Sequence, residues 1–223
     1  MTPRKGLHHK RAVVPALDAL RRRFGRPRRT RRFSPLEELI LTVLSQNTND
    51  GNRDRAFASL VAAFPAWGLV ARAPVRTVER AIRTGGLARI KSRVIQAILR
   101  RIEVERGDFD LGFLREIPLD EAHAWLRSFS GVGDKTAACV LLFSCGRPAF
   151  PVDTHILRAS RRLGWIPAGA SAAEAHRRLA AVIPKRRYFE AHVNLITLGR
   201  RLCKPRNPRC PECPLATGCP TAP

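Results

Sequence analysis

The sequence predicts an all-α protein built from two helical lobes. Apolar residues recur at helical spacing, as at Val13, Leu17 and Leu20, and no alternation of apolar and polar residues lasts long enough to build a sheet. Of the 223 residues, 44% are hydrophobic, which is ample for a buried core. These observations together favour helices packed on helices.

The helices follow in order from their local signals. The first is expected over 13–24 and to stop before Gly25 and Pro27. Ser34 as N-cap and Pro35 in the first turn predict the start of a second helix over 36–45. Further helices are expected over 54–64, 75–83, 91–106, 119–129, 136–144 and 154–163. We expect a six-helix barrel over 28–147 and a discontinuous second lobe formed by 1–27 and 148–223.

The charge of the chain points to a nucleic acid. The formal net charge is +23, from 41 Lys and Arg against 18 Asp and Glu, and such an excess is either solvated or paired with a polyanion. A membrane partner is disfavoured because no apolar run approaches about 18 residues. Only 6% of the residues are aromatic, which favours a duplex over a single strand bound by stacking. We expect a cytoplasmic protein, nucleoid-associated in a bacterium, whose basic tail over 1–11 is disordered or faces DNA.

Four cysteines near the end of the chain form the pattern C-x6-C-x2-C-x5-C. They are Cys203, Cys210, Cys213 and Cys219. A disulfide framework is disfavoured in a chain of this length with so few cysteines. An iron–sulfur cluster is favoured over zinc because structural zinc usually takes two close ligand pairs, and only one C-x-x-C is present. Zinc and free thiols stay as alternatives.

The cysteine quartet is expected to stabilise its lobe rather than to perform chemistry, because all four ligand positions are filled by protein. The loop between the first two cysteines carries Lys204, Arg206 and Arg209, which we expect to contact DNA phosphates. Cys139 and Cys145 lie in an apolar stretch and are interpreted as core thiols.

A second motif, Ser130 to Lys135, joins two expected helices. Gly131 and Gly133 flank the small apolar Val132, so the turn can present backbone N–H groups at the start of a helix. A DNA phosphate is the expected ligand, although a G-x-G can equally be a tight turn between helices.

Lys135 and Asp153 are the candidate catalytic residues. An amine held near a carboxylate in a basic protein can act as a nucleophile toward an electrophilic sugar carbon. The alternatives are simple: Asp153 is also a plausible N-cap for the helix after it, and Lys135 could be a surface cation on a phosphate.

These motifs, in this order, resemble the endonuclease III branch of the helix-hairpin-helix DNA glycosylases. The similarity rests on Gly131-Val132-Gly133-x-Lys135-Thr136-Ala137, on Val152-Asp153-Thr154-His155 and on the cysteine quartet, and it runs from about Leu36 to Cys219. It implies a monomeric base-excision repair enzyme with one [4Fe-4S] cluster. Such an enzyme binds duplex DNA, removes oxidised pyrimidines and nicks the abasic strand as a lyase.

The resemblance also implies residue roles. Lys135 would attack C1′ of the flipped nucleotide and form a Schiff base, while Asp153 would stabilise the developing positive charge. Gln46 or Asn47, with Leu87, match the places of the side chains that fill the gap in the base stack. Lys91 and His155 complete the expected DNA contacts. The base is expected to enter a cleft between the lobes.

The sequence departs from the family pattern at several places. Ser130 replaces a proline, Asp134 puts an acid beside Lys135, and the Gln46-Asn47 pair differs from the usual Ala-Gln order. The basic tail has no equivalent. Two rival functions therefore stay open: a monofunctional glycosylase for mismatched or deaminated bases, and a non-catalytic iron–sulfur DNA-binding module.

Overall fold

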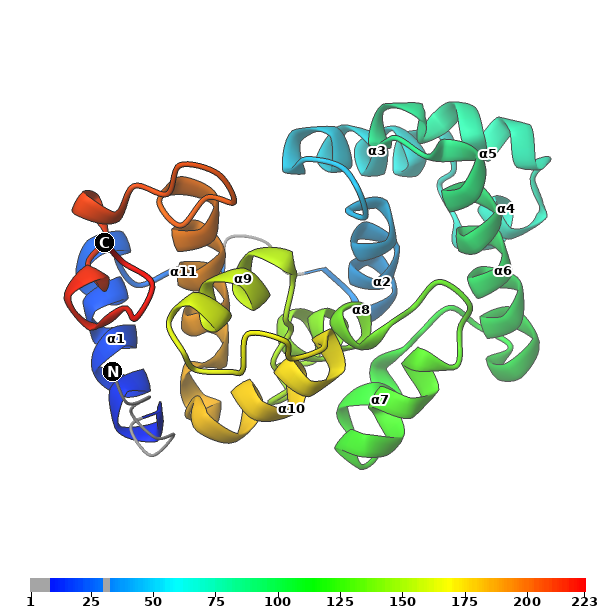
Figure 1. The fold of residues 1–223 in the computed structure, drawn as a ribbon. Helices are drawn as coiled ribbons and strands as arrows, with labels where there is room; N and C mark the ends of the chain where they lie inside the picture. The colour runs from blue at the N-terminus through cyan, green and yellow to red at the C-terminus, as the bar shows by residue number, and fades with distance from the viewer. Residues whose placement is uncertain (1–8, 30–32) are drawn as a thin grey trace. The chain divides into compact units, whose positions relative to one another are not determined.

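The computed structural model describes residues 9–29 and 33–223, and every regular element in these ranges is helical (Figure 1). The all-α prediction is confirmed. None of the helices in the described ranges has the length and apolar character needed to cross a membrane. The expected basic tail lies outside the described residues up to residue 8, and the first helix begins at His9, earlier than the periodicity indicated.

The chain divides into two compact units. One comprises Arg31–Arg147 and is called the hairpin unit; the other comprises Met1–Thr30 with Pro148–Pro223 and is called the cysteine unit. The sequence places the first boundary at 27/28 and the second at 147/148, so the two divisions differ by three residues at the first boundary and agree at the second.

The hairpin unit holds seven α-helices among its described residues. They are α2 (Pro35–Leu44), α3 (Asp50–Ala63), α4 (Trp67–Arg72), α5 (Val75–Ala81), α6 (Ala88–Arg106), α7 (Leu119–Arg127) and α8 (Asp134–Cys139), and a π-helical segment, Val140–Ser144, continues α8. The extra helix relative to the predicted six is α4. It is missed because six residues are too few to display a helical period.

Helix α2 is the centre of the hairpin unit. Its start is the predicted one: the Ser34 hydroxyl accepts from the Glu37 amide at 3.2 Å, and the Glu37 carboxylate accepts from the Ser34 amide at 2.7 Å. This reciprocal capping box satisfies donors that the first turn leaves without helical partners. Helix α2 packs against α3, α6 and α8, and most of its residues are buried.

The cysteine unit contains α1 (His9–Phe24), α9 (Thr154–Arg162), α10 (Ala172–Val182) and α11 (Tyr188–Arg201). Helices α10 and α11 have no counterpart among the helices expected from the sequence. Helix α11 packs against both α1 and α9, as Figure 1 shows. Asn194 on α11 donates to the Gly25 carbonyl at 3.2 Å, which ties the end of α1 to α11.

The packing of α11 on α9 requires a glycine. A Cβ atom at Gly199 would lie 2.8 Å from the His155 Cβ and 3.2 Å from the His155 carbonyl oxygen. Both distances are shorter than van der Waals contact, so a side chain here would force the two helices apart.

We therefore expect Gly199→Ala to lower the free energy of unfolding by about 1 to 3 kcal/mol, the usual cost of overpacking. Urea denaturation of both proteins checks this value. Gly169→Ala is the matched control, because a Cβ at Gly169 meets no atom within 4 Å. Equal losses for the two variants would contradict the close-packing account.

Candidate functional site

The predicted hairpin turn is present between α7 and α8. Gly131 has φ of +83°, in the region that favours glycine, and a Cβ there would lie 2.9 Å from Val94 Cγ1. The Val132 side chain is only 6% exposed, and its amide donates to the Phe129 carbonyl at 3.1 Å. The Val132 side chain therefore anchors the turn, whereas Ser130, Gly131 and Gly133 are exposed.

The end of α2 lies against this turn. The Gln46 side-chain amide donates to the Gly131 carbonyl at 3.1 Å, so one of the predicted gap-filling residues is tied directly to the hairpin. Gln46 and Asn47 are both exposed, and Asn47 has φ of 53°. Asparagine tolerates this left-handed conformation better than most residues, because its short polar side chain can bond locally. The local fold thus presents two polar side chains beside the glycine turn.

Leu87 projects from the loop before α6. Its side chain is 50% exposed although it is large and apolar, and its backbone is left-handed, with φ of 49° and ψ of 32°. A leucine in this region costs roughly 1 to 2 kcal/mol, so its surroundings must hold it there. An exposed apolar side chain on a restrained backbone has the properties of the expected wedge.

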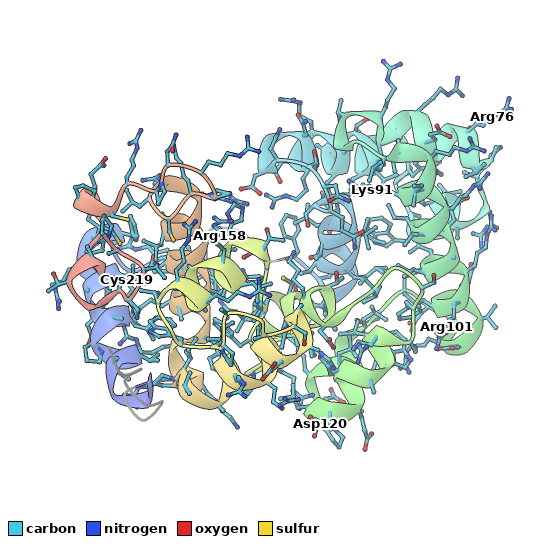
Figure 2. All side chains as sticks on the ribbon, viewed as in Figure 1. Arg76, Lys91, Arg101, Asp120, Arg158 and Cys219 are labelled. Carbon is cyan, nitrogen blue, oxygen red and sulfur yellow. The ribbon has the colours of Figure 1, made fainter. Side chains whose placement is uncertain are left out.

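The restraint comes from Lys91, labelled in Figure 2. Its ammonium donates to the Leu44 carbonyl at 2.7 Å and to the Gly85 carbonyl at 2.8 Å, and the side chain is only 2% exposed. Burial lowers the pKa of Lys91. The sequence prediction that Lys91 contacts DNA is therefore wrong, because the ammonium is inside the unit. Lys91 joins the end of α2 to the loop that carries Leu87.

Lys135 lies in the first turn of α8 and is half-buried. The neighbouring Asp134 was expected to hold Lys135 as an ammonium ion. Instead the Asp134 carboxylate pairs with Arg127 at 3.0 Å and with His123 at 3.7 Å, both on α7. Asp134 is thus committed to α7, and its negative charge is partly compensated there.

A carboxyl group that sequence reasoning overlooked, Glu38, lies on α2 near Lys135. Burial raises the pKa of Glu38 to about 7, and the Thr42 hydrogen bond and the charges of Lys135 and Arg53 oppose that rise. The Thr42 hydroxyl donates to Glu38 Oε1 at 3.3 Å. In the sequence Glu38 follows Glu37 and looks like one more acid of a helix start, so only its tertiary surroundings distinguish it.

Asp153 occupies the N-cap of α9 in the cysteine unit. Its carboxylate accepts from the Ile156 amide at 2.8 Å. The alternative structural role proposed from the sequence is therefore confirmed. This bond uses Oδ1 alone, and a carboxylate has acceptor capacity on both oxygens, so capping and a second role are compatible.

Helix α9 connects Asp153 to the cysteine loop through two arginines. Arg158, labelled in Figure 2, donates to the carbonyls of Cys203 at 3.0 Å and Gly199 at 2.8 Å and contacts His155 Nδ1 at 3.2 Å. Arg162 donates to the Lys204 carbonyl at 2.6 Å and to Cys203 Sγ at 3.4 Å. Sequence reasoning missed both arginines. Their spacing from His155, at i+3 and i+7, is the signal that they share one helix face.

The four predicted cysteines line one cavity of about 190 Å³ in the cysteine unit. None of the four forms a disulfide, and the pKa of Cys213 is raised by burial and by the nearby charges of the other three. In the described part of the chain, no group of three or more His, Cys, Asp or Glu side chains is placed to hold a metal ion.

Two basic cavities lie beside the cysteine loop. One, of about 510 Å³, is lined by His155, Lys204 and Arg206 together with Gly199, Arg200 and Pro205. It therefore brings together three of the residues predicted to contact DNA.

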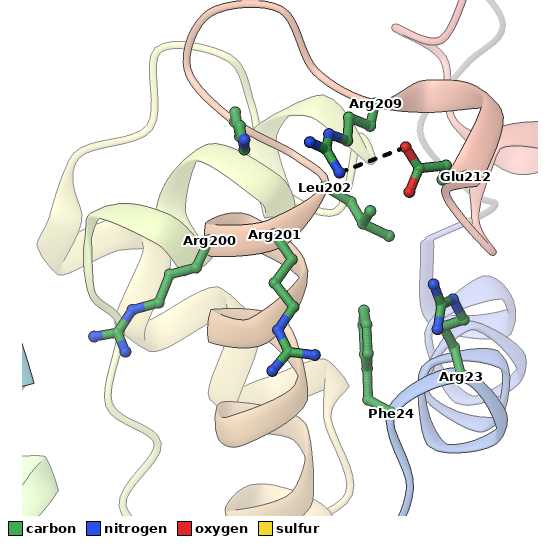
Figure 3. A pocket seen from close by; sticks show the side chains of 8 residues that line it. Arg23, Phe24, Arg200, Arg201, Leu202, Arg209 and Glu212 are labelled. Carbon is green, nitrogen blue, oxygen red and sulfur yellow. Dashed lines mark ion pairs between the residues drawn. The ribbon is translucent and has the colours of Figure 1, made fainter.

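The other cavity, of about 400 Å³, is shown in Figure 3. It is lined by Arg23, Phe24, Arg200, Arg201, Leu202, Lys204, Arg209 and Glu212. The predicted contact residue Arg209 forms an ion pair with Glu212 at 3.7 Å here, the dashed line in Figure 3. Cations outnumber acids in this lining, so the cavity suits a phosphate group.

We expect Lys91→Met to lower the free energy of unfolding by about 2 kcal/mol or more, because two carbonyls lose their buried donor. Amide hydrogen exchange should also speed up at 85–88. Arg89→Met, at an exposed position on the same helix, serves as control. Unchanged exchange in Lys91→Met would contradict the role given to Lys91.

Comparisons with known proteins agree with this geometry. Residues 40–185 match the family model of the HhH-GPD superfamily base excision DNA repair proteins. A candidate DNA glycosylase of Arabidopsis thaliana is 42% identical over 171 residues, which are 77% of this chain and 58% of the plant protein. The chain thus spans little more than half of that relative.

Endonuclease III of Thermotoga maritima is 33% identical over 193 residues, covering 86% of both chains. A solved structure of a trapped covalent endonuclease III–DNA intermediate superimposes with a TM-score of 0.82 at 31% identity, over 95% of each chain. The family match spans well over half the chain, and these relatives share its full architecture. The chain therefore belongs to the HhH-GPD superfamily of base excision DNA repair proteins, and within it the chain is similar to endonuclease III.

Proposed function

We propose that this glycosylase removes oxidised pyrimidines from duplex DNA and then cleaves the abasic strand as a lyase. The observation that carries the proposal is Lys135, an amine in the first turn of the helix after the hairpin. The similarity of the chain to an endonuclease III structure that was trapped as a covalent DNA intermediate supports a nucleophilic mechanism.

In the proposed reaction the neutral Lys135 Nζ attacks C1′ of the damaged nucleotide. The N-glycosidic bond breaks with its electron pair going to the base, which takes up a proton and leaves. Asp153 stabilises the positive charge that develops on the sugar. The C1′–O4′ bond then breaks and O4′ takes up a proton, so that Nζ and C1′ form a protonated Schiff base. This group activates loss of the C2′ proton, and the C3′–O bond breaks as the 3′ phosphate leaves by β-elimination.

The DNA is held by groups from both units. Exposed hairpin residues Gly131 and Gly133 offer backbone contacts for a phosphate, and Gln46, Asn47 and Leu87 fill the space that the flipped base leaves. Support comes from the hydrogen bond that joins Gln46 to Gly131 and from the exposure of Leu87. In the cysteine unit, the basic cavities around Lys204, Arg206 and Arg209 offer additional phosphate contacts.

The four cysteines are proposed to hold one [4Fe-4S] cluster. When bound, the cluster would crosslink the chain after α11 and add stability without taking part in the reaction. One contact supports such a role, because Arg162 donates to Cys203 Sγ at 3.4 Å.

Borohydride trapping tests the mechanism. Wild-type protein is incubated with duplexes that each carry one lesion: thymine glycol, 8-oxoguanine, uracil or a mismatched thymine. We expect a reduced covalent adduct and strand cleavage without alkali on thymine glycol, and neither product with Lys135→Ala. Lys185→Ala, which removes an exposed lysine of the cysteine unit, should behave as wild type.

Other outcomes identify the rival functions. Base release that gives strand cleavage only after alkali, with no trapped adduct, means a monofunctional glycosylase. Release of no base from any duplex, with binding intact, means a non-catalytic module. A thymine glycol duplex left intact beside a processed mismatch would overturn the proposed substrate class.

The cluster proposal has its own test. Cys213→Ala should lose the visible absorption of an iron–sulfur protein and lower the free energy of unfolding by about 3 kcal/mol or more, since metal binding is coupled to folding. Cys145→Ala, outside the quartet, should keep the absorption. A Cys213→Ala protein with unchanged iron content and stability would contradict the ligand assignment.

A further inference from the structure

Glu38 is placed within the hairpin unit where it can act on Lys135. It lies on α2, which packs directly against α8, the helix that carries Lys135. Most of the Glu38 side chain is buried, and its Oε1 accepts a hydrogen bond from Thr42, one turn further along α2. A buried carboxyl group is costly unless it has a partner or a function.

The charged side chains on the elements packed against α2 leave Lys135 as the partner of Glu38. Helix α3 contributes Arg53, but that guanidinium already pairs with Asp50 at 3.1 Å and Asp54 at 2.8 Å. Helix α6 contributes Lys91, whose ammonium is bound to the Leu44 carbonyl at the end of α2 and to the Gly85 carbonyl. The π-helical segment 140–144 carries no charged residue.

Helix α8 contributes Lys135, whose charge interacts with that of Glu38. Among the residues that the structure describes, Lys135 forms no direct ion pair, so its amine is not bound to another acid. Glu38 and Lys135 therefore lie on two helices in direct contact and interact through their charges. Polar groups beyond direct hydrogen-bond distance are commonly joined by one water.

We propose that Glu38 is the proton acceptor that converts the Lys135 ammonium into the neutral nucleophile. Resting on the proposed function, the step is a transfer through one water: the Nζ proton moves to the carboxylate, leaving a neutral amine and a carboxylic acid. No electrons are exchanged, and the total charge is unchanged. Glu38 acts through Lys135 and is a positioning residue that need not touch DNA.

The acidity of Glu38 suits this step. A proton acceptor works best when its pKa lies near the operating pH, and the raised value of about 7 meets that condition. The acceptor form is the carboxylate, so adduct formation should rise with pH up to about 7 and then level off. Below that pH the rate should fall about tenfold for each unit.

The test is single-turnover formation of the borohydride adduct on a duplex with a preformed abasic site, measured from about pH 5 to 9. This substrate removes base release from the measurement. Glu38→Gln should be slower than wild type by at least about tenfold at pH 8 and should lose the inflection near 7. Glu37→Gln is the matched control, because Gln preserves the capping acceptor of an adjacent acid, and it should keep both rate and profile.

Two further readouts separate this role from a structural one. Thr42→Val removes a hydrogen bond that lowers the pKa of Glu38, so the inflection should move to higher pH. Glu38→Gln should also unfold at a higher temperature than wild type above pH 7. The folded-state pKa is raised from 4.5 to about 7, so the carboxyl group lowers the stability of the fold progressively as pH rises between these two values, and the loss is complete above about pH 7.

The outcomes are distinct. No adduct with wild type on either abasic or lesion duplexes overturns the proposed function itself. With wild type active, a Glu38→Gln protein that matches Glu37→Gln in rate and profile overturns the role of Glu38. A Glu38→Gln protein that is slower at every pH but keeps the inflection near 7 also overturns it.

Discussion

In both units, cationic side chains donate hydrogen bonds to carbonyl oxygens that the helices cannot satisfy themselves. Every α-helix leaves its last carbonyls without helical donors, and this chain has many short helices. Lys91 serves the end of α2, and Arg158 and Arg162 serve the end of α11 and the loop after it. The same device recurs where Arg100 donates to Ala71 and Arg147 donates to Leu114. The functional side chains depend on these bonds for their positions.

This device changes the meaning of the net charge. From composition, an excess of +23 is either solvated or paired with a polyanion. The structure adds a third role for a basic residue: a buried cation is stabilised by carbonyl dipoles and makes no contact with DNA. Lys91 is the clear case. Lys204, Arg206 and Arg209 differ because their side chains line open cavities, so the basic residues divide into an internal and an external set.

Local sequence signals predicted the features that depend on residues close together in the chain. The capping box at Ser34, the hairpin turn at Gly131 and the N-cap at Asp153 each follow from residue types a few positions apart. The common role of the four cysteines in lining one cavity was likewise readable from their spacing.

The missed features depend on tertiary contacts. Nothing near Glu38 in the sequence reveals that its helix packs against α8, and nothing near Lys91 reveals the carbonyls of Leu44 and Gly85. The position of Asp134 next to Lys135 predicts an interaction between the two side chains, but the Asp134 carboxylate pairs with Arg127 on α7. Sequence separation therefore decided which parts of the site were predictable.

At Leu87, a backbone conformation that lowers stability also exposes an apolar side chain. Glycine would occupy the same left-handed conformation without steric cost, so Leu87→Gly would relieve strain. It would also delete the exposed apolar side chain of that loop. Directed evolution for heat resistance alone should consequently select glycine at this position. If leucine is retained instead, a requirement other than folding selects for it.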